Sequence, residues 1–221
     1  MSSADQEGLF DVVAPRPAVR DESFTRRGRI ATFVVDDVVL GSAGQARREY
    51  LMHPGAVAVL ALDAAGRVAM LNQYRHAVRS NLWEIPAGLL DKAGEEPLAA
   101  AQRELAEEAD LVAGRWDVLV DFLCSPGITD ESIRVYLARD LTEVSESERF
   151  ERTEEEAEFE VRWVPLDDVV QSIARGELHS PSLLVGALAA RNAWRSGAAD
   201  GDGWVGLRPG NAPWPYQPGT F

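Results

Sequence analysis

Cysteine is almost absent from this sequence, which has Cys124 as its single thiol among 221 residues. One thiol cannot form a disulfide within the chain, so the composition excludes a disulfide-stapled fold and fits a reducing, cytoplasmic compartment. Cys124 follows two apolar residues, Phe122 and Leu123. We therefore expect its side chain to be a small buried apolar group rather than a nucleophile.

Long apolar runs are also missing. The longest uninterrupted one extends from Ala56 to Leu62, far short of the roughly 20 residues that a membrane-spanning helix needs. The opening residues, MSSADQEGLF, have neither the basic nor the apolar region of a secretory signal, so we expect none. We therefore expect no membrane among the partners of this protein.

Basic residues are in the minority. There are 22 Lys and Arg against 36 Asp and Glu, and the formal net charge is −14. Proteins that bind nucleic acids or anionic lipids use basic patches to displace counterions. The charge balance therefore argues against general binding to DNA, RNA or membranes. A small anionic substrate is still allowed, because divalent cations can sit between its phosphates and acidic side chains.

Strand-forming segments dominate the chain. Strands are expected at residues 30–40, 47–53, 55–62, 67–78, 82–88, 116–127, 133–141 and 159–166. Helices are expected at residues 97–111, from 167 or 168 to 174, and at 180–194. Strands before one helix, followed by more strands and two helices, predict an α+β fold with a mixed sheet rather than a doubly wound fold.

These patterns divide the chain into three parts. Residues 1–52 are predicted to form a loose arm followed by a small antiparallel β unit, and residues 53–196 are predicted to form the main domain. Residues 197–221 form a tail rich in Gly, Pro and Trp. This tail is either flexible or packed in part as an extended arm through its aromatic side chains.

The stretch from Gly88 to Leu111, GLLDKAGEEPLAAAQRELAEEADL, carries seven carboxylates. Pro97 suits the first position of a helix. Glu104 and Glu108 are four residues apart, so both project from one side of that helix, with their Cα atoms ~6 Å apart along its axis. Two carboxylates at this spacing can bind one hard cation or two adjacent ones.

A solvated acidic face is the other interpretation of this helix, and the helix alone does not decide between the two. Like charges four residues apart destabilise a helix by ~0.2–0.5 kcal/mol per pair, which a bound cation would relieve. Leu98, Ala101, Leu105 and Ala109 repeat at intervals of three and four and predict one buried face. Glu104 flanks that face, so we expect its carboxylate at a groove. These two points favour a metal site.

The same stretch closely resembles the Nudix box, the loop–helix–loop motif of the Nudix hydrolases. The matching residues are Gly88, Glu95, Arg103, Glu104, Leu105, Glu107, Glu108 and Leu111. This chain departs from the motif in having one additional loop residue, Gly94, and in having Asp110 where a glycine is usual. Asp110 would need a left-handed conformation, which Asp tolerates moderately well. Neither departure touches the Arg-Glu-x-x-Glu-Glu core.

The resemblance implies the Nudix α/β/α sandwich with a mixed sheet, and hydrolysis of a nucleoside diphosphate linked to another group. It also implies two or three Mg²⁺ or Mn²⁺ ions, which would neutralise the pyrophosphate and lower the pKa of a bound water. The implied metal ligands are Ala87 (through its carbonyl), Glu104 and Glu108. Glu107 would be a further ligand or a base, and Glu95 would pair with Arg103.

The chain outside the box resembles the ADP-ribose pyrophosphatase subgroup, from about Gly28 to Trp194. Pro126 lies fifteen residues after Leu111, as is typical of that subgroup, and the segments RREYLMHPGAVAVL and NQYRHAV…WEIPAG are similar to its segments. The resemblance implies hydrolysis of ADP-ribose to AMP and ribose 5-phosphate. The implied substrate-binding residues are Arg29, Arg48, Glu49, Arg75, Glu84, Gly88, Ser125 and Glu131.

Individual roles follow from the same resemblance. Arg75 would bind the diphosphate, which a guanidinium can do bidentately. Arg48 and Glu49 would line the pocket, and Ser125 and Glu131 would contact the terminal ribose. The competing interpretations are a surface ion pair for Arg75 and Arg48, and a merely solvent-facing strand position for Glu84.

The catalytic base of this subgroup lies on a loop after the box. The acidic stretch 143–158 has no apolar period and is expected to be an exposed loop. Within it we favour Glu155, with Glu154 and Glu156 as close alternatives. A loop that closes over the substrate would position a water molecule and exclude the rest.

The subgroup usually forms homodimers by exchanging its N-terminal β unit, which completes the adenosine pocket of the other subunit. Relatives have an aromatic residue that stacks on adenine near the position of Arg29 and Ile30. Arg29 could stack through its guanidinium plane. A domain-swapped homodimer is therefore the expected assembly.

Three other functions remain open on the sequence. The substrate could be a different nucleoside diphosphate sugar, such as GDP-mannose or ADP-glucose. The chain could also be a sensor that binds ADP-ribose without cleaving it, although sensors usually lose a box glutamate and none is missing here. Finally, the carboxylate helix could be an interaction surface that binds no metal.

Overall fold

The computed structural model describes residues 9–150, 160–194 and 203–218. Its larger part contains a five-stranded sheet in the order β12-β9-β10-β5-β8 and a three-stranded sheet in the order β11-β6-β7. The strands of the first are Arg208–Pro209, Leu111–Leu123, Ser132–Glu143, Ala56–Ala61 and Ala87–Leu89; those of the second are Glu160–Pro165, Arg67–Arg75 and Ser80–Glu84. β10 runs parallel to β5 and antiparallel to β9, so the predicted mixed sheet is confirmed.

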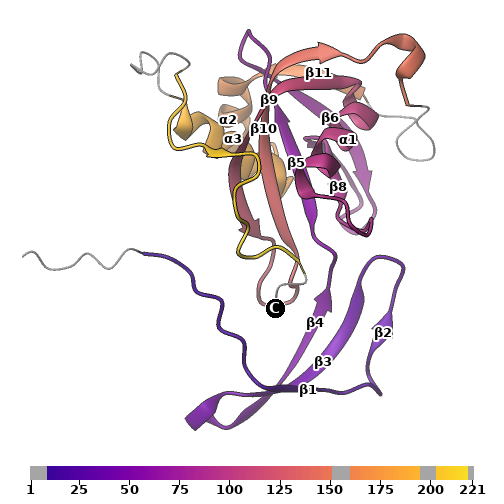
Figure 1. Cartoon of the computed structure of the whole chain (residues 1–221), viewed down its shortest axis with the longest axis vertical. Helices are drawn as coiled ribbons and strands as arrows, with labels where there is room; N and C mark the ends of the chain where they lie inside the picture. The colour runs from indigo at the N-terminus through magenta and orange to yellow at the C-terminus, as the bar shows by residue number, and fades with distance from the viewer. Residues whose placement is uncertain (1–8, 151–159, 195–202, 219–221) are drawn as a thin grey trace, which may run out of the picture.

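Three helices cover these sheets: α1 (Pro97–Ala109), α2 (Leu166–Ala174) and α3 (Pro181–Ala193). Figure 1 shows α1 on one side of β5 and β10, and α2 and α3 on the other. Short 3₁₀ turns occur at Gly41–Ala43 and Glu146–Glu148. The predicted α+β sandwich is therefore the observed architecture, with the carboxylate helix forming one of its outer layers.

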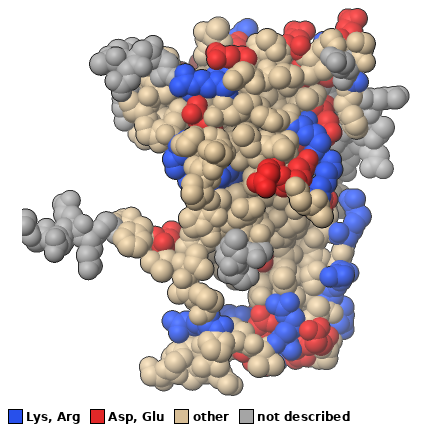
Figure 2. Space-filling view, viewed as in Figure 1, with Lys and Arg blue, Asp and Glu red and all other residues tan. Residues whose placement is uncertain are grey.

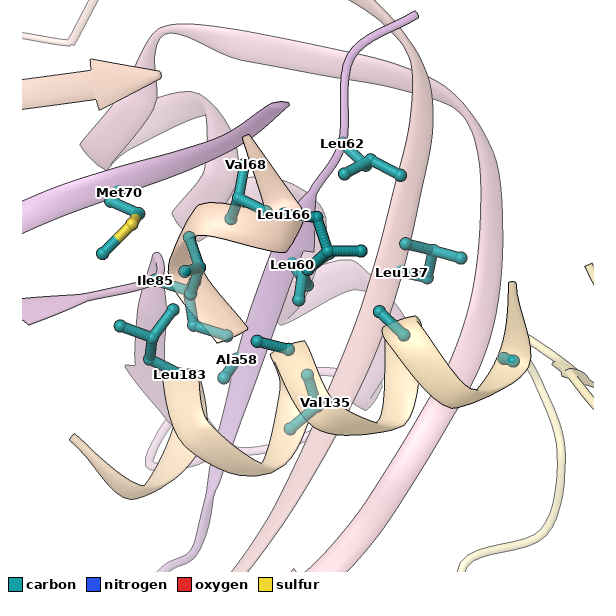
Figure 3. Packing of buried hydrophobic residues seen from close by; sticks show 14 of the residues in the cluster. Ala58, Leu60, Leu62, Val68, Met70, Ile85, Val135, Leu137, Leu166 and Leu183 are labelled. Atoms are coloured by element: carbon teal, nitrogen blue, oxygen red, sulfur yellow. The ribbon is translucent and has the colours of Figure 1, made fainter. Parts of the chain in front are cut away.

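Two apolar clusters fill the space between the sheet and the two helix layers. β5 is buried along its whole length, because alternate side chains point to opposite faces of a strand and both faces are covered. Ala58 and Leu60 face α3, whereas Val57 and Val59 face α1. Figure 3 shows Leu60 packed among Val135, Leu137 and Leu183. The sheet is thus packed on both faces and supports the loop and helix that follow β8.

The carboxylate helix begins at Pro97 as predicted, but it ends at Ala109 rather than at Leu111. Pro97 occupies its first turn, and Asp110 ends it in the left-handed conformation with a φ of 54°. Ala101, Leu105 and Ala109 are buried against the sheet, and Leu98 packs at the edge of the same cluster. The expected tolerance of Asp for the left-handed position is therefore realised.

The N-terminal residues form a separate antiparallel sheet below this body (Figure 1). It consists of β1 (Ala18–Arg20), β2 (Arg26–Arg27), β3 (Thr32–Val39) and β4 (Gln45–Met52). Only its central residues Val34, Val35 and Asp36 are buried. β4 leads directly into the larger body, where the N–H of Leu51 donates to the carbonyl of Ile128.

Several elements differ from the sequence prediction. β1 and β2 were expected to be loop, and β9 begins at Leu111 rather than near residue 116, because its pairing with β10 continues through Gly114. The tail is ordered over residues 203–218, with Trp204 and Trp214 buried, so the extended-arm interpretation is correct for that part. No helix within the described ranges is long and apolar enough to cross a membrane.

Candidate active site

The residues of the box converge where β8 passes under α1. Gly88 lies so close to Glu104 that a Cβ at Gly88 would overlap the Glu104 carboxylate. Only a glycine therefore allows this side chain to lie across the strand. The Glu104 side chain is 12% exposed, so it is not the solvated acidic face that was the competing interpretation.

Arg103 holds three carboxylates around this point. Its guanidinium donates bidentately to Glu95, with distances of 2.8 and 2.9 Å. Its Nη1 donates to Glu104 at 2.6 Å and to Glu107 at 3.0 Å. The predicted pairing of Glu95 with Arg103 is present. Hydrogen bonds from Arg103 lower the pKa of Glu95, so this carboxylate stays charged.

Glu108 completes the carboxylate pair one turn further along α1. It is 7% exposed, and its Oε2 accepts a 2.9 Å hydrogen bond from the backbone N–H of Ala87. The Ala87–Gly88 strand thus contacts Glu108 through one residue and Glu104 through the next. The structure brings together all three expected metal ligands: the Ala87 backbone, Glu104 and Glu108.

Glu104 is the carboxylate of this site whose charged form is disfavoured by burial. Burial raises its pKa above the ordinary carboxyl value, although Arg103 acts in the opposite direction. A buried carboxylate with a raised pKa gains most from a cation that replaces its lost hydration. Carboxylate and carbonyl oxygens are the donors that Mg²⁺ and Mn²⁺ prefer. The residues present therefore fit such an ion.

A complete side-chain cage for a metal is not found in the described part of the chain. No group of three or more His, Cys, Asp or Glu side chains is poised to hold an ion there. Mg²⁺ sites commonly use one or two carboxylates and complete their shell with water and substrate phosphates. Two glutamates and one carbonyl match that open type of site.

Arg75 and Glu84 form a pair on neighbouring strands, β6 and β7. Arg75 donates bidentately to Glu84, with distances of 2.8 and 2.6 Å. Glu84 is 8% exposed, so it is not a solvent-facing strand position. Arg75 is exposed, and the pair fixes the direction of its guanidinium without covering it.

Ser125 and Glu131 lie on the loop between β9 and β10. The carbonyl of Ser125 accepts the N–H groups of Ile128 and Thr129, and the Ser125 side chain is exposed. Glu131 lies 3.6 Å from His53. This loop therefore faces the segment that joins the N-terminal sheet to the larger body.

Arg48 and Glu49 lie elsewhere in the chain. Both are exposed on β4, in the N-terminal sheet that Figure 1 shows below the body carrying α1. They line a groove of about 490 Å³ with the loop 126–130. Arg29 is exposed in the turn before β3. These three residues are thus separated from the Glu104 carboxylate within one chain.

The favoured base Glu155 and its alternatives Glu154 and Glu156 lie outside the described residues. Their assignment remains a prediction.

One set of residues close to the site could not be predicted from the sequence. The tail segment 208–218 lies along β9 and ends beside the loop before α1, where Pro218 packs on Gly55. Only the aromatic residues of the tail gave a signal that part of it packs. Nothing in the sequence indicated where.

Comparison with known proteins agrees with this arrangement. A NUDIX domain model matches residues 52–184. The ADP-ribose pyrophosphatase of Mycobacterium tuberculosis (strain ATCC 25618 / H37Rv) is 41% identical over 194 residues, covering 88% of this chain and 89% of that protein. The ADP-ribose pyrophosphatase of Bacillus subtilis (strain 168) is 39% identical over 153 residues, covering 69% and 80%.

A solved structure supports the fold. The crystal structure of an ADP compounds hydrolase superposes with a TM-score of 0.61, covering 80% of this chain and 90% of that one. Its sequence is 20% identical, so it bears on architecture alone.

Proposed function

The chain belongs to the Nudix hydrolase family, and from this premise we propose that it hydrolyses the diphosphate of ADP-ribose to AMP and ribose 5-phosphate. The observation that carries the proposal is the convergence of Ala87, Glu104 and Glu108 beneath Arg103. The two ADP-ribose pyrophosphatases that match most of the chain support this choice of substrate.

The metal site consists of two buried carboxylates and one carbonyl. Glu104, Glu108 and the Ala87 carbonyl would hold Mg²⁺ or Mn²⁺, which supplies charge neutralisation and a more acidic bound water. Arg103 keeps Glu104 oriented toward Gly88, and Glu95 in turn fixes Arg103. Glu107 shares Arg103 with Glu104, so it is placed to adjust the charge of the site as a further ligand or base. We propose two or three ions.

Substrate contacts come from the strands beside this site. Arg75 is held by Glu84 with its guanidinium exposed, an arrangement that suits bidentate binding of a phosphate. Ser125 and Glu131 would bind the terminal ribose from the β9–β10 loop, and Gly88 would approach the diphosphate with its backbone. A base at Glu155, or at Glu154 or Glu156, would then take the proton of the attacking water.

The position of Arg48 and Glu49 favours a homodimer. Both are exposed on β4 of the N-terminal sheet, which Figure 1 shows below the body that carries α1. The same sheet exposes apolar side chains, including Val19 at 72% and Phe24 at 55% exposed. We propose that a second copy of the chain covers this surface, and that Arg29, Arg48 and Glu49 reach the partner's site by domain exchange.

The alternative functions are less well supported by the same residues. A sensor without activity would not need the intact Arg-Glu-x-x-Glu-Glu core or its buried geometry. A helix that binds a protein partner would not bury Glu104 and Glu108 against β8. Another nucleoside diphosphate sugar remains the closest competing substrate.

Replacement of Glu108 by Gln tests the metal site. Glu108→Gln keeps an oxygen that can accept from the Ala87 N–H but removes the charge that a cation needs. We expect an unchanged melting temperature and a loss of turnover of at least about 100-fold, since a metal contributes several kcal/mol to the transition state. Glu96→Gln, an exposed residue before the same helix, is the control and should keep full activity.

The assay itself distinguishes the substrates. The protein is incubated with Mg²⁺ and a panel of ADP-ribose, ADP-glucose and GDP-mannose, and phosphomonoester products are counted. Preference for another substrate would reject the proposed specificity for ADP-ribose. Wild-type turnover by Glu108→Gln would reject Glu108 as a metal ligand.

Substitution of the acidic loop tests the base. We expect Glu155→Gln to slow turnover with little change in metal affinity, because a base acts on water rather than on the ion. If Glu154→Gln or Glu156→Gln carries the loss instead, the assignment within this loop moves to that residue.

A further inference from the structure

The tail segment Arg208–Pro218, which we call the strap, is bound to the sheet by a buried arginine. The Arg134 side chain is 3% exposed and donates bidentately to Asp121, with distances of 2.7 and 2.9 Å. Two further hydrogen bonds go to the strap: Nη1 donates to the carbonyl of Ala212 at 2.7 Å and Nη2 to that of Pro213 at 3.0 Å. The indole of Trp214 covers the guanidinium at 4.8 Å.

This geometry couples the strap to the sheet. A buried guanidinium needs acceptors for its N–H groups, and an unsatisfied buried donor costs about 1–3 kcal/mol. Asp121 alone does not supply them, because Nη1 of Arg134 donates to Ala212. The same carboxylate also accepts from Arg208 at 3.0 Å. Arg134 therefore holds the strap in place as long as the pair is buried.

The first half of the strap touches α1. β12 pairs with β9, and Gly210 follows directly. A Cβ at Gly210 would lie 3.3 Å from Cδ2 of Leu98, in the first turn of α1. Ala212 packs against the apolar cluster that also contains Leu98 and Leu90. The strap thus lies against the beginning of the carboxylate helix.

The end of the strap reaches the loop before that helix. Pro218 packs so closely on Gly55 that a Cβ there would overlap its ring, and Gly55 has a φ of 77°. The carbonyl of Gly55 accepts from the N–H of Leu90. Gln217 and Pro218 also line a cavity of about 240 Å³ with the loop from Leu90 to Glu95. Figure 2 shows acidic and basic side chains interspersed over this view of the molecule.

We propose that the strap is a positioning element of the active site, with Arg134 as its anchor. It fixes the loop Leu90–Glu95 against Gly55, and Glu95 in turn fixes Arg103, which orients Glu104. The strap contacts neither Glu104 nor Glu108 in the hydrogen bonds described. The strap therefore acts indirectly, by holding the loop that carries Glu95. The step from Glu95 to metal rests on the proposed function.

Hydrogen exchange in the full chain tests the coupling without any metal or substrate. The loop has two reporter amides, Leu90, bonded to Gly55, and Glu95, bonded to Lys92. In Arg134→Met we expect both to exchange about tenfold faster or more, because loss of the anchor allows local opening. The strap amides of Ala212 and Gln217, which have their own hydrogen bonds, should exchange faster as well.

A matched control separates this effect from general destabilisation. Arg139 is also a buried arginine of β10 paired with an aspartate of β9, Asp117, but Asp117 lies opposite Pro209, at the other end of the strap from Pro218. Arg139→Met should lower the melting temperature without changing exchange at Leu90 or Glu95. Equal acceleration of those amides in both variants would overturn the proposal.

A second variant keeps the test decisive if Arg134→Met does not fold. Pro218→Gly removes the ring that packs on Gly55 and also frees the backbone at this position, and it should accelerate exchange of the same two loop amides. Pro215→Gly makes the same change at an exposed position of the strap and should not. Unchanged exchange at Leu90 and Glu95 in Pro218→Gly would show that the strap does not position the loop.

Binding of Mn²⁺ gives the functional readout. It is measured by the electron paramagnetic resonance signal of the free ion. Loss of partners that orient metal ligands typically weakens metal affinity by about 10–100-fold. We expect a shift at the lower end of this range in Arg134→Met and Pro218→Gly, with a smaller change in kcat at saturating Mn²⁺. Unchanged affinity would confine the strap to a structural role. A wild-type protein that binds no Mn²⁺ would instead reject the metal site, and the exchange result would stand alone.

Discussion

Gly88 has only a hydrogen where every other residue would have a side chain, and Glu104 occupies that space. Gly88→Ala should therefore displace the Glu104 carboxylate. We expect the variant to be destabilised by about 1–3 kcal/mol, as for other overpacked positions, and to lose most of its activity. Thermal unfolding and the ADP-ribose assay measure the two effects.

Gly127→Ala is the control for stability at the same scale. A Cβ at Gly127 would meet nothing within 4 Å, so its melting temperature should match the wild type. If Gly88→Ala also unfolds at the wild-type temperature with full activity, Glu104 does not need the space that Gly88 leaves.

Residues within the box could be predicted from sequence because their geometry is local. Glu104, Glu108 and Arg103 share one helix, and helical spacing alone places them on adjacent faces. An ion pair was one of the two interpretations of Arg75, but its partner Glu84 could not be predicted, since the pair depends on the register between β6 and β7. Still less predictable was Arg134, whose partners in the strap lie 78 and 79 residues away.

At the scale of elements, the strand expected at 55–62 is present as β5, and its continuous apolar run suits a strand that is buried along its whole length. β1 and β2 were not predicted because they are only three and two residues long and form by pairing with β3. β12 is two residues long and exists only through its pairing with β9. Elements made by long-range pairing leave little local signal in the sequence.

The N-terminal sheet depends on one charged centre that titrates. Asp36 is 8% exposed and is bound by Arg20 and by the hydroxyl of Tyr50. The hydrogen bond from Arg20 lowers the pKa of Asp36 below the ordinary value of an aspartate. A carboxyl with a lowered pKa stabilises the fold above its unfolded pKa, and this contribution is lost as the pH falls through the folded value.

Asp36→Asn removes this titration. We expect the wild type to be more stable than the variant by about 1–2 kcal/mol at neutral pH, as for hydrogen bonds to charged groups. The difference should shrink as the pH falls below about 4, since only the wild type then loses a charge. Denaturant unfolding at a series of pH values measures it. A difference that is constant down to pH 3 would contradict the role assigned to Asp36.

At the scale of the whole molecule, the site is proposed to be shared between two chains. If Arg48 serves the partner's site, Arg48→Ala and Glu108→Gln subunits should complement each other. A mixed dimer then contains one site with an intact box and an intact Arg48. We expect the mixture, refolded together, to show activity that neither variant has alone.

A mixture of Glu104→Gln and Glu108→Gln subunits is the control, because every site in it has a defective box. Light scattering gives the mass of the assembly in the same samples. If the protein is a monomer, or if Arg48→Ala regains no activity when it is mixed with Glu108→Gln, the proposal that the site is shared between two chains is wrong.

The half-buried Cys124 has a practical consequence. Burial and the nearby Glu131 raise the pKa of its thiol to about 12, so only about one molecule in 10⁵ carries the reactive thiolate at neutral pH. Thiol reagents should therefore leave the native chain unmodified and react once it is denatured. A cysteine introduced on the strap could then carry a spectroscopic label in the otherwise natural sequence, and its motion could be followed while the enzyme turns over.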